Sequence, residues 1–377
     1  MNNIKNLRLF NNLKQKDVAD YLGITQQSYS YLENQESDIK DKEKLEKLAT
    51  LFKVDINELT KNKPFDVCSY LEKSYTSFHA VKNAEEILVS NGFKKIYTKD
   101  AWTLNKGDKY YITKNDSALL AFKIGDLSNY AFNIAGSHTD SPSLRVKGDS
   151  LIDSPEGKRI NVEVYGSLIL YSMLDIPLKV AGRIITKKNG ILYSNIYESK
   201  CTVNIPSLCI HHNSSVNEGI HLNPQVDMLP LVGNINSIYE LFDLDGEPVD
   251  SDLFVVPEVK PYYSGINNEF LVSPRIDNLT SCFSSLMALI DSNPKGIALA
   301  CLFDNEEIGS ETKQGAQSAL LENLLLKINK NLLRLLMYYK YYVLFLYSKF
   351  CLIVLYFYLF LLRGLVLEDN LHRICRA

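Results

Sequence analysis

Two apolar runs, each leading into a cluster of polar side chains, constrain the fold of this 377-residue chain more than any other feature. Residues 131–135 lead into Gly136-Ser137-His138-Thr139-Asp140, and residues 297–303 lead into Asp304-Asn305-Glu306-Glu307. Short, continuous apolar runs bounded by polar residues are consistent with buried strands. Open α/β sheets present functional groups at the ends of such strands, so the pattern predicts an α/β fold with chemistry at its strand ends.

The two polar motifs contain the residue types of a metal-dependent hydrolase. A His followed two residues later by an Asp can ligate zinc while the acid supports the imidazole. Of two adjacent glutamates, one can ligate the metal and the other can deprotonate water. A lone His or acidic pair is usually part of a solvated loop, but here both motifs directly follow apolar runs. We therefore predict that the two motifs together form the site of a metal-dependent hydrolase.

Charge and cysteine usage exclude some classes of protein. The net charge is −3, so no overall basic field indicates nucleic-acid binding, and any such role must be local. The 7 cysteines are scattered without C-x-x-C spacing, which favours reduced thiols over a disulfide framework. The N-terminal residues include no apolar signal segment. These features predict a cytoplasmic protein.

Residues 1–62 predict a small all-α domain with apolar positions at helical spacing. One helix is expected over 16–23 and a second over 25–34, with Gly23 between them and Thr25 as the cap of the second. The polar residues that open the second helix suit reading of the DNA major groove, where Gln can pair with adenine. The segment resembles a phage-repressor-type helix-turn-helix, which implies DNA contacts by Gln26, Gln27 and Ser28.

The charge of this N-terminal segment leaves its partner open. Residues 1–62 contain ten Lys/Arg and ten Asp/Glu. Because phosphate neutralisation dominates DNA affinity, a single neutral copy should bind DNA weakly unless several copies act together. A protein-interaction module of the same fold is therefore the alternative to a DNA-binding domain.

The rest of the chain divides into regions of different pattern. Residues 65–146 and 266–327 mix helix and strand signals, and we expect them to form two parts of one catalytic α/β domain. Residues 147–265 show short alternating runs and predict an inserted β-rich domain. Residues 328–377 are dominated by Leu, Tyr, Phe, Lys and Ile without turn signals, and they predict an aberrant tail that truncates or replaces the end of the catalytic domain. A membrane-seeking helix and a native buried helix are the alternatives, since 341–362 are almost wholly apolar.

With Pro274-Arg275-Ile276-Asp277-Asn278 added, residues 65–326 resemble the aspartyl aminopeptidase family of dinuclear zinc exopeptidases. Further blocks of resemblance are Asn115-Asp116-Ser117, Asn223 to Pro230, Tyr263 to Phe270 and Thr312 to Ala316. The resemblance implies two zinc ions per subunit, with His138 on one, Glu307 on the other and Asp277 bridging them. It also implies that Asp140 orients His138 and that Glu306 is the general base. The implied reaction removes N-terminal residues from peptides, usually acidic ones.

The family pattern also implies one further Asp and one further His as metal ligands, from the region where the apolar tail stands. The tail contains Asp369 and His372, but their surroundings do not resemble the family's blocks. We therefore expect impaired zinc binding and activity. The resemblance further implies a homo-oligomer formed through the inserted domain. A DNA-binding transcriptional regulator with a degenerate peptidase body is the alternative function, and membrane contact is expected only through the tail.

Overall fold

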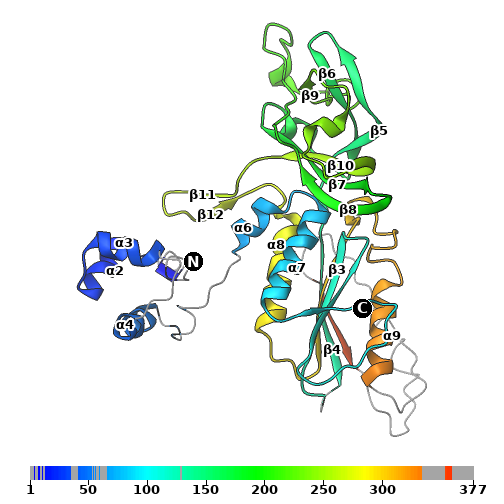
Figure 1. Cartoon of the computed structure of the whole chain (residues 1–377). Coiled ribbons are helices and arrows are strands. Elements are labelled where there is room, and N and C mark those ends of the chain that lie inside the picture. The colour runs from blue at the N-terminus through cyan, green and yellow to red at the C-terminus, as the bar shows by residue number, and fades with distance from the viewer. Residues whose placement is uncertain are drawn as a thin grey trace, which may run out of the picture.

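The computed structural model describes residues 13–34, 41–52, 66–127 and 130–332, the backbone of 353–358, and residues 4, 7, 8, 11, 54, 56 and 59 (Figure 1). Among the helices in these ranges, none is long and apolar enough to cross a membrane.

The N-terminal region is a helix-turn-helix unit, as the sequence predicts. Its helices are α2 (Gln15–Leu22), α3 (Gln26–Asn34) and α4 (Lys42–Phe52). Gly23 ends α2 because it takes the left-handed conformation, with φ of 69°. Its amide donates hydrogen bonds to the carbonyls of Ala19 and Asp20 in the last turn of the helix. Thr25 begins α3, since its Oγ1 accepts a hydrogen bond from the Ser28 amide at 3.1 Å. The predicted turn and cap are therefore confirmed.

A buried charge ties the start of the chain to α3. The Glu33 carboxylate is almost fully buried and accepts hydrogen bonds from Arg8 Nε at 2.6 Å and Gln15 Nε2 at 2.7 Å. Tyr29 donates to the same carboxylate at 3.4 Å. A buried carboxylate is tolerated only when it is paired in this way. The contacts therefore fix α3 against α2 and the residues before it.

The α/β domain, which the sequence predicts to be the catalytic domain, is built on a mixed sheet with the strand order β1-β2-β3-β13-β4-β14. The strands are β1 (Lys94–Lys95), β2 (Lys109–Lys114), β3 (Ala118–Ile124), β4 (Ala131–His138), β13 (Ile297–Phe303) and β14 (Ile353–Tyr358). The central strand β13 is antiparallel to β3 and parallel to β4. The apolar runs at 131–135 and 297–303 are therefore confirmed as strands, the second with its predicted bounds.

Helices cover both faces of this sheet (Figure 1). They are α6 (Val67–Lys73), α7 (Ser77–Ser90), α8 (Ile276–Asp291) and α9 (Leu320–Leu332). Alternate residues of β3 pack in opposite directions: Leu119 joins the core formed with α6, α7 and α8, whereas Leu120 joins the core formed with α9. Because β3 and β13 are buried on both faces, their sequences read as continuous apolar runs.

An antiparallel β-rich domain lies between the two parts of the catalytic domain, with the strand order β8-β7-β10-β5-β6-β9. Its strands are β5 (Ser143–Ser154), β6 (Gly157–Tyr165), β7 (Leu178–Lys188), β8 (Ile191–Glu198), β9 (Leu231–Gly233) and β10 (Glu247–Pro257). One face buries a separate apolar core that includes Val162, Val180 and Val255. A hairpin of β11 (Tyr262–Ser264) and β12 (Phe270–Val272) then leads into α8.

The C-terminal region is described only in part. Helix α9 continues to Leu332, past position 328, where the sequence predicts the start of the tail. Residues 353–358 pair antiparallel with β4 as an edge strand, whereas both helical alternatives for this region expect a helix. Residues 333–352 and 359–377, including Asp369 and His372, lie outside the described residues.

Candidate metal centre

The two predicted motifs meet at adjacent strand ends. Strands β4 and β13 run in parallel with His138 opposite Phe303, so both chains leave the sheet at the same edge. The Thr139 amide then donates to the Phe303 carbonyl at 2.8 Å. As a result, Asp140 and Glu306, which are 166 positions apart in sequence, are in direct contact. The sheet topology thus shows that the two motifs are neighbours in space, which the sequence pattern alone could not show.

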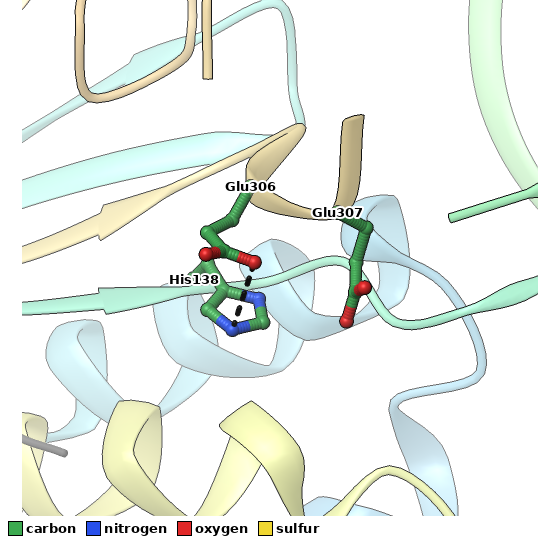
Figure 2. Close-up of side chains that lie close together, drawn as sticks. All are labelled: His138, Glu306 and Glu307. Carbon is green, nitrogen blue, oxygen red and sulfur yellow. Dashed lines mark ion pairs between the residues drawn. The ribbon is translucent and has the colours of Figure 1, made fainter. Parts of the chain in front are cut away.

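His138, Glu306 and Glu307 each direct a potential ligand atom into one space (Figure 2), and these atoms lie within 4.8 Å of one another. His138 Nε2 lies 3.8 Å from Glu306 Oε2 and 3.4 Å from Asp277 Oδ1. The imidazole is largely buried, whereas the Asp277 side chain is 84 % exposed. An imidazole nitrogen and carboxylate oxygens are donors that suit zinc, and the exposed acids leave the site accessible to a ligand.

Asp140 holds the two halves of this cluster together. His138 Nδ1 lies 3.1 Å from the Asp140 carbonyl oxygen and 3.4 Å from its Oδ1. Because a carbonyl can only accept, Nδ1 carries the proton and Nε2 is the atom that can ligate a metal. The Asp140 carboxylate also accepts the amides of Glu306 and Glu307, each at 3.2 Å. Asp140 thereby fixes the imidazole and the paired glutamates relative to each other.

Left-handed backbone conformations precede both acidic parts of the site. Arg275 and Asn305 each have φ of 62°, and they lie shortly before Asp277 and Glu306, respectively. Such conformations cost about 1–3 kcal/mol for residues other than glycine and persist only where the surroundings hold them. Arg275 is held by its guanidinium, which donates to the carbonyls of Pro257 at 3.1 Å and Leu71 at 3.2 Å. The surrounding structure therefore stabilises the turns that present the acids.

The electrostatics of the cluster favour a cation. Burial alone would lower the pKa of His138, but the hydrogen bond and charge of Asp140, with the charges of Glu306 and Asp277, raise this pKa to about 9. Burial, together with the neighbouring carboxylates, raises the pKa of Glu307 to about 7, although His138 opposes the shift. The neighbouring carboxylates contribute to both shifts, and a bound metal ion would neutralise their negative charge.

A cavity of about 240 Å³ lies against Asp140, where the catalytic domain meets the inserted domain. Tyr165 and Phe254 of the inserted domain line it, as do Asn305 and Asp304 of the catalytic domain. Burial first, and then the charge of Asp140, raise the pKa of Asp304 to about 7. The inserted domain therefore forms part of the cavity wall beside the candidate metal ligands.

Two residues of this region are absent from the sequence-based prediction. Tyr165 donates to Asp140 Oδ2 at 2.7 Å, and Asn305 Nδ2 donates to the Tyr165 hydroxyl at 2.9 Å. Tyr165 ends β6 within the region predicted to be β-rich, and Asn305 directly precedes the paired glutamates. Their positions next to recognised elements are the only sequence signal that could have indicated them.

The residues predicted to contact DNA lie at the start of α3. Gln26, Gln27 and Ser28 are all exposed there, directly after the Thr25 cap. The structure therefore leaves these three side chains accessible on the second helix of the unit.

A parallel strand pair that presents an imidazole and paired glutamates at one sheet edge defines the class of α/β metallohydrolases. Comparison with known proteins identifies the family. Residues 70–241 and 240–343 match the family described as "Aminopeptidase I zinc metalloprotease (M18)", and residues 4–59 match a helix-turn-helix family. The chain belongs to the M18 aminopeptidase family and has an N-terminal helix-turn-helix domain.

Relatives of known sequence agree with this assignment. The chain is 40 % identical over 282 residues to the probable M18 family aminopeptidase 2 of Clostridium novyi, covering 70 % of this chain and 65 % of that protein. It is 33 % identical over 315 residues to aspartyl aminopeptidase 4 of Saccharomyces cerevisiae, covering 71 % of this chain and 64 % of that one. The chain thus spans somewhat less than two thirds of the length of these relatives.

Solved structures show the same fold. The Ape4 and Nbr1 complex matches with a TM-score of 0.66 and 29 % identity, covering 71 % of this chain and 58 % of that one. The S. cerevisiae mApe1 dodecamer matches with a TM-score of 0.60 and 27 % identity, covering 70 % of this chain and 65 % of that one.

Proposed function

We propose that this chain is a zinc-dependent aminopeptidase in which His138, Asp277 and Glu307 are metal ligands and Glu306 is the general base. The observation that carries the proposal is the meeting of His138, Glu306 and Glu307 at the ends of the parallel strands β4 and β13. Membership of the M18 family supports the same reaction.

The donor set fits zinc, and the surrounding residues fit peptide hydrolysis. Bound zinc would polarise the scissile carbonyl and make a water molecule more acidic. Glu306 is half exposed and its Oε2 lies 3.8 Å from His138 Nε2, so it can take a proton from the attacking water and return it to the departing amine. Asp140 keeps Nε2 of His138 directed at the ligand space. Following the family, the proposed substrates are peptides, with acidic N-terminal residues preferred.

We further propose that zinc binding and hydrolysis are impaired in this chain. With Asp277 shared between two zinc ions, His138 would hold one and Glu307 the other. Each ion would then have fewer protein ligands than a closed zinc shell provides. Within residues 66–332, the grouped ligand atoms come from His138, Glu306 and Glu307, without the further Asp and His that the resemblance implies.

The test combines metal analysis with peptide hydrolysis on the purified full chain. Zinc content is measured after dialysis, and release of N-terminal Asp and Leu from short peptides is followed. Glu306→Gln should retain zinc and lose hydrolysis, whereas His138→Ala should lose both. Glu322→Gln, an exposed acid on α9, is the control and should change neither.

Three results decide between the parts of this proposal. Hydrolysis that survives Glu306→Gln would refute the role of general base. A chain that never binds zinc would refute the metal site. Two tightly held zinc ions with fast, Glu306-dependent hydrolysis would refute only the impairment.

We also propose that the chain forms homo-oligomers through the inserted β-rich domain. The matched mApe1 structure is a dodecamer, which supports assembly in this family. The edge strand β8 includes three exposed apolar side chains, Ile191, Leu192 and Tyr193. Light scattering on the full chain tests this, and Leu192→Lys should reduce the measured mass.

A cytoplasmic location remains our proposal from the sequence. The cysteines in the described ranges, at 68, 201, 209, 282 and 301, are all free thiols, which supports a reducing compartment. Localisation of a tagged full-length chain by microscopy or fractionation is the direct test.

DNA-binding regulation is the second candidate function, because Gln26, Gln27 and Ser28 are exposed at the start of α3. An electrophoretic shift assay with DNA fragments from the protein's own genome would reveal sequence-specific retention. The double variant Gln26→Ala/Gln27→Ala should abolish it, whereas Glu46→Ala on the exposed side of α4 should not. Unchanged retention in the double variant would refute this reading.

A further inference from the structure

The inserted domain contacts the metal site through two consecutive residues, Tyr165 and Gly166. Tyr165 is the last residue of β6, and its side chain is buried against the catalytic domain. Its hydroxyl donates to Asp140 Oδ2 at 2.7 Å. Gly166 follows directly and lies against Glu307. One strand end of the inserted domain therefore reaches both halves of the site.

The hydrogen bonds around the Tyr165 hydroxyl make it a donor to Asp140. Asn305 Nδ2 donates to the hydroxyl oxygen at 2.9 Å, so the hydroxyl proton is free to point at Asp140. The orientation of the Asn305 amide is fixed in turn, because its Oδ1 accepts from Thr312 at 2.8 Å and from Gln314 at 3.0 Å. The hydroxyl is thus the donor in a chain of bonds that ends on Asp140.

Loss of this donor would disturb more than one ligand. The Asp140 carboxylate accepts from Tyr165 and from the amides of Glu306 and Glu307. It also lies beside His138 Nδ1. A shift or rotation of Asp140 would therefore move the imidazole relative to the paired glutamates. Partners of this kind, which hold a ligand without touching the metal, often affect metal affinity 10- to about 100-fold.

The backbone of Gly166 lies so close to the Glu307 side chain that there is no room for a Cβ atom at position 166. A Cβ atom at this position would lie 2.9 Å from the Glu307 Cβ and 3.1 Å from its Oε2. The backbone here also has φ of +70°, a conformation that favours glycine. A larger residue must therefore displace Glu307 or distort the turn that follows β6.

We propose that Tyr165 and Gly166 are positioning residues through which the inserted domain sets the geometry of the metal site. This inference rests on the proposed function, since it presumes that His138 and Glu307 bind zinc. It adds a role for the inserted domain within its own subunit, apart from assembly.

The test is zinc affinity of the full chain, measured by competition with a chromophoric chelator. Tyr165→Phe should weaken zinc binding by about 10-fold or more while the unfolding of the metal-free chain changes little. Tyr110→Phe is the matched control. It removes the hydroxyl of Tyr110 on β2, which donates a hydrogen bond to the Asp108 carboxylate at 2.9 Å. It should leave zinc affinity unchanged.

A second pair of variants tests the close approach separately and does not depend on how Tyr165→Phe folds. Gly166→Ala should weaken zinc binding. Gly190→Ala is the control, since Gly190 also has positive φ, +81°, but no atom lies within 4 Å of a Cβ built there. It should affect stability alone.

The outcomes separate this inference from the proposed function. If the unmodified chain binds no zinc, both fail. If it binds zinc and neither Tyr165→Phe nor Gly166→Ala weakens the affinity relative to its control, the positioning role fails and the metal site stands. A loss of affinity confined to the two site variants supports the role.

Discussion

Thr139 is bonded to the end of β13 through its amide, which donates to the Phe303 carbonyl oxygen at 2.8 Å, and its single hydroxyl proton is shared between two carbonyls, with Oγ1 3.0 Å from the same Phe303 oxygen. The same Oγ1 lies 2.7 Å from the carbonyl of Ser117, just before β3. The buried threonine therefore joins three strand ends at the sheet edge that carries the proposed metal site.

The first prediction follows from this contact. Thr139→Val preserves shape but leaves buried carbonyls without the hydroxyl donor, so the free energy of unfolding should fall by about 1–3 kcal/mol. Urea denaturation followed by circular dichroism measures the change. Thr98→Val, at an exposed position, should stay within about 0.5 kcal/mol of the unmodified chain. Equal effects at the two positions would refute the explanation.

The second prediction concerns acid stability and His79 on α7. Burial, followed by the charges of nearby Lys and Arg residues, lowers the pKa of His79 to about 3. Glu198 Oε1, 3.9 Å from Nε2, would favour protonation, but burial outweighs it. The unfolded chain binds this proton from about pH 6.5 downward, whereas the folded chain does not until about pH 3.

The contribution of neutral His79 to stability is therefore complete above about pH 6.5 and is lost progressively as the pH falls toward 3. Each pKa unit corresponds to about 1.4 kcal/mol. His79→Asn should flatten the decline of the unfolding free energy between pH 6.5 and 4, and the exposed variant His221→Asn should not. Parallel pH profiles for His79→Asn and the unmodified chain would contradict this account.

The third prediction separates a buried ion pair from an exposed one in the helix-turn-helix domain. Arg8→Met removes the cation 2.6 Å from the buried Glu33 carboxylate, and breaking such a pair costs about 3–5 kcal/mol. We expect the helices of this domain to melt at a clearly lower temperature. Lys42→Met breaks an exposed ion pair with Glu46, and such pairs contribute about 0–1 kcal/mol to the free energy of unfolding. Thermal melts that shift by the same amount in both variants would refute the distinction.

The fourth prediction concerns metal addition and removal. Zinc at about 100 times its dissociation constant should stabilise the folded chain by about 2.7 kcal/mol and raise its melting temperature, and a chelator should reverse the rise. His138→Ala should abolish the zinc-dependent rise. His212→Ala, at an exposed position of the inserted domain, should keep it. A rise that persists in His138→Ala would place the bound zinc elsewhere.

Local signals explain what the sequence could predict. The αL turn at Gly23 and the cap at Thr25 depend on residues close in sequence, so the two helices of the helix-turn-helix motif were predictable. The buried runs of β3 and β13 were equally clear. The break between α6 and α7 at 74–76 was not predictable in this way. The sequence there has no Gly or Pro to mark the break.

Contacts between distant residues explain what the sequence could not predict. That β13 lies between β3 and β4 follows from pairing across the whole inserted domain, for which a linear pattern holds no signal. The bond from Tyr165 to Asp140 likewise joins two domains. The zinc ligands and the general base were proposed from the family resemblance, and their roles remain predictions.

The position of β13 also affects the order in which the chain can fold during synthesis. Strands β3 and β4 are consecutive in sequence but do not pair, because β13 occupies the place between them. Until residue 303 has left the ribosome, both strands have an unpaired edge, and unpaired edges invite association with other chains. The inserted domain, built from antiparallel pairs closer in sequence, can fold during this interval. We therefore expect nascent chains that end between residues 140 and 300 to depend on chaperones more than the finished protein does.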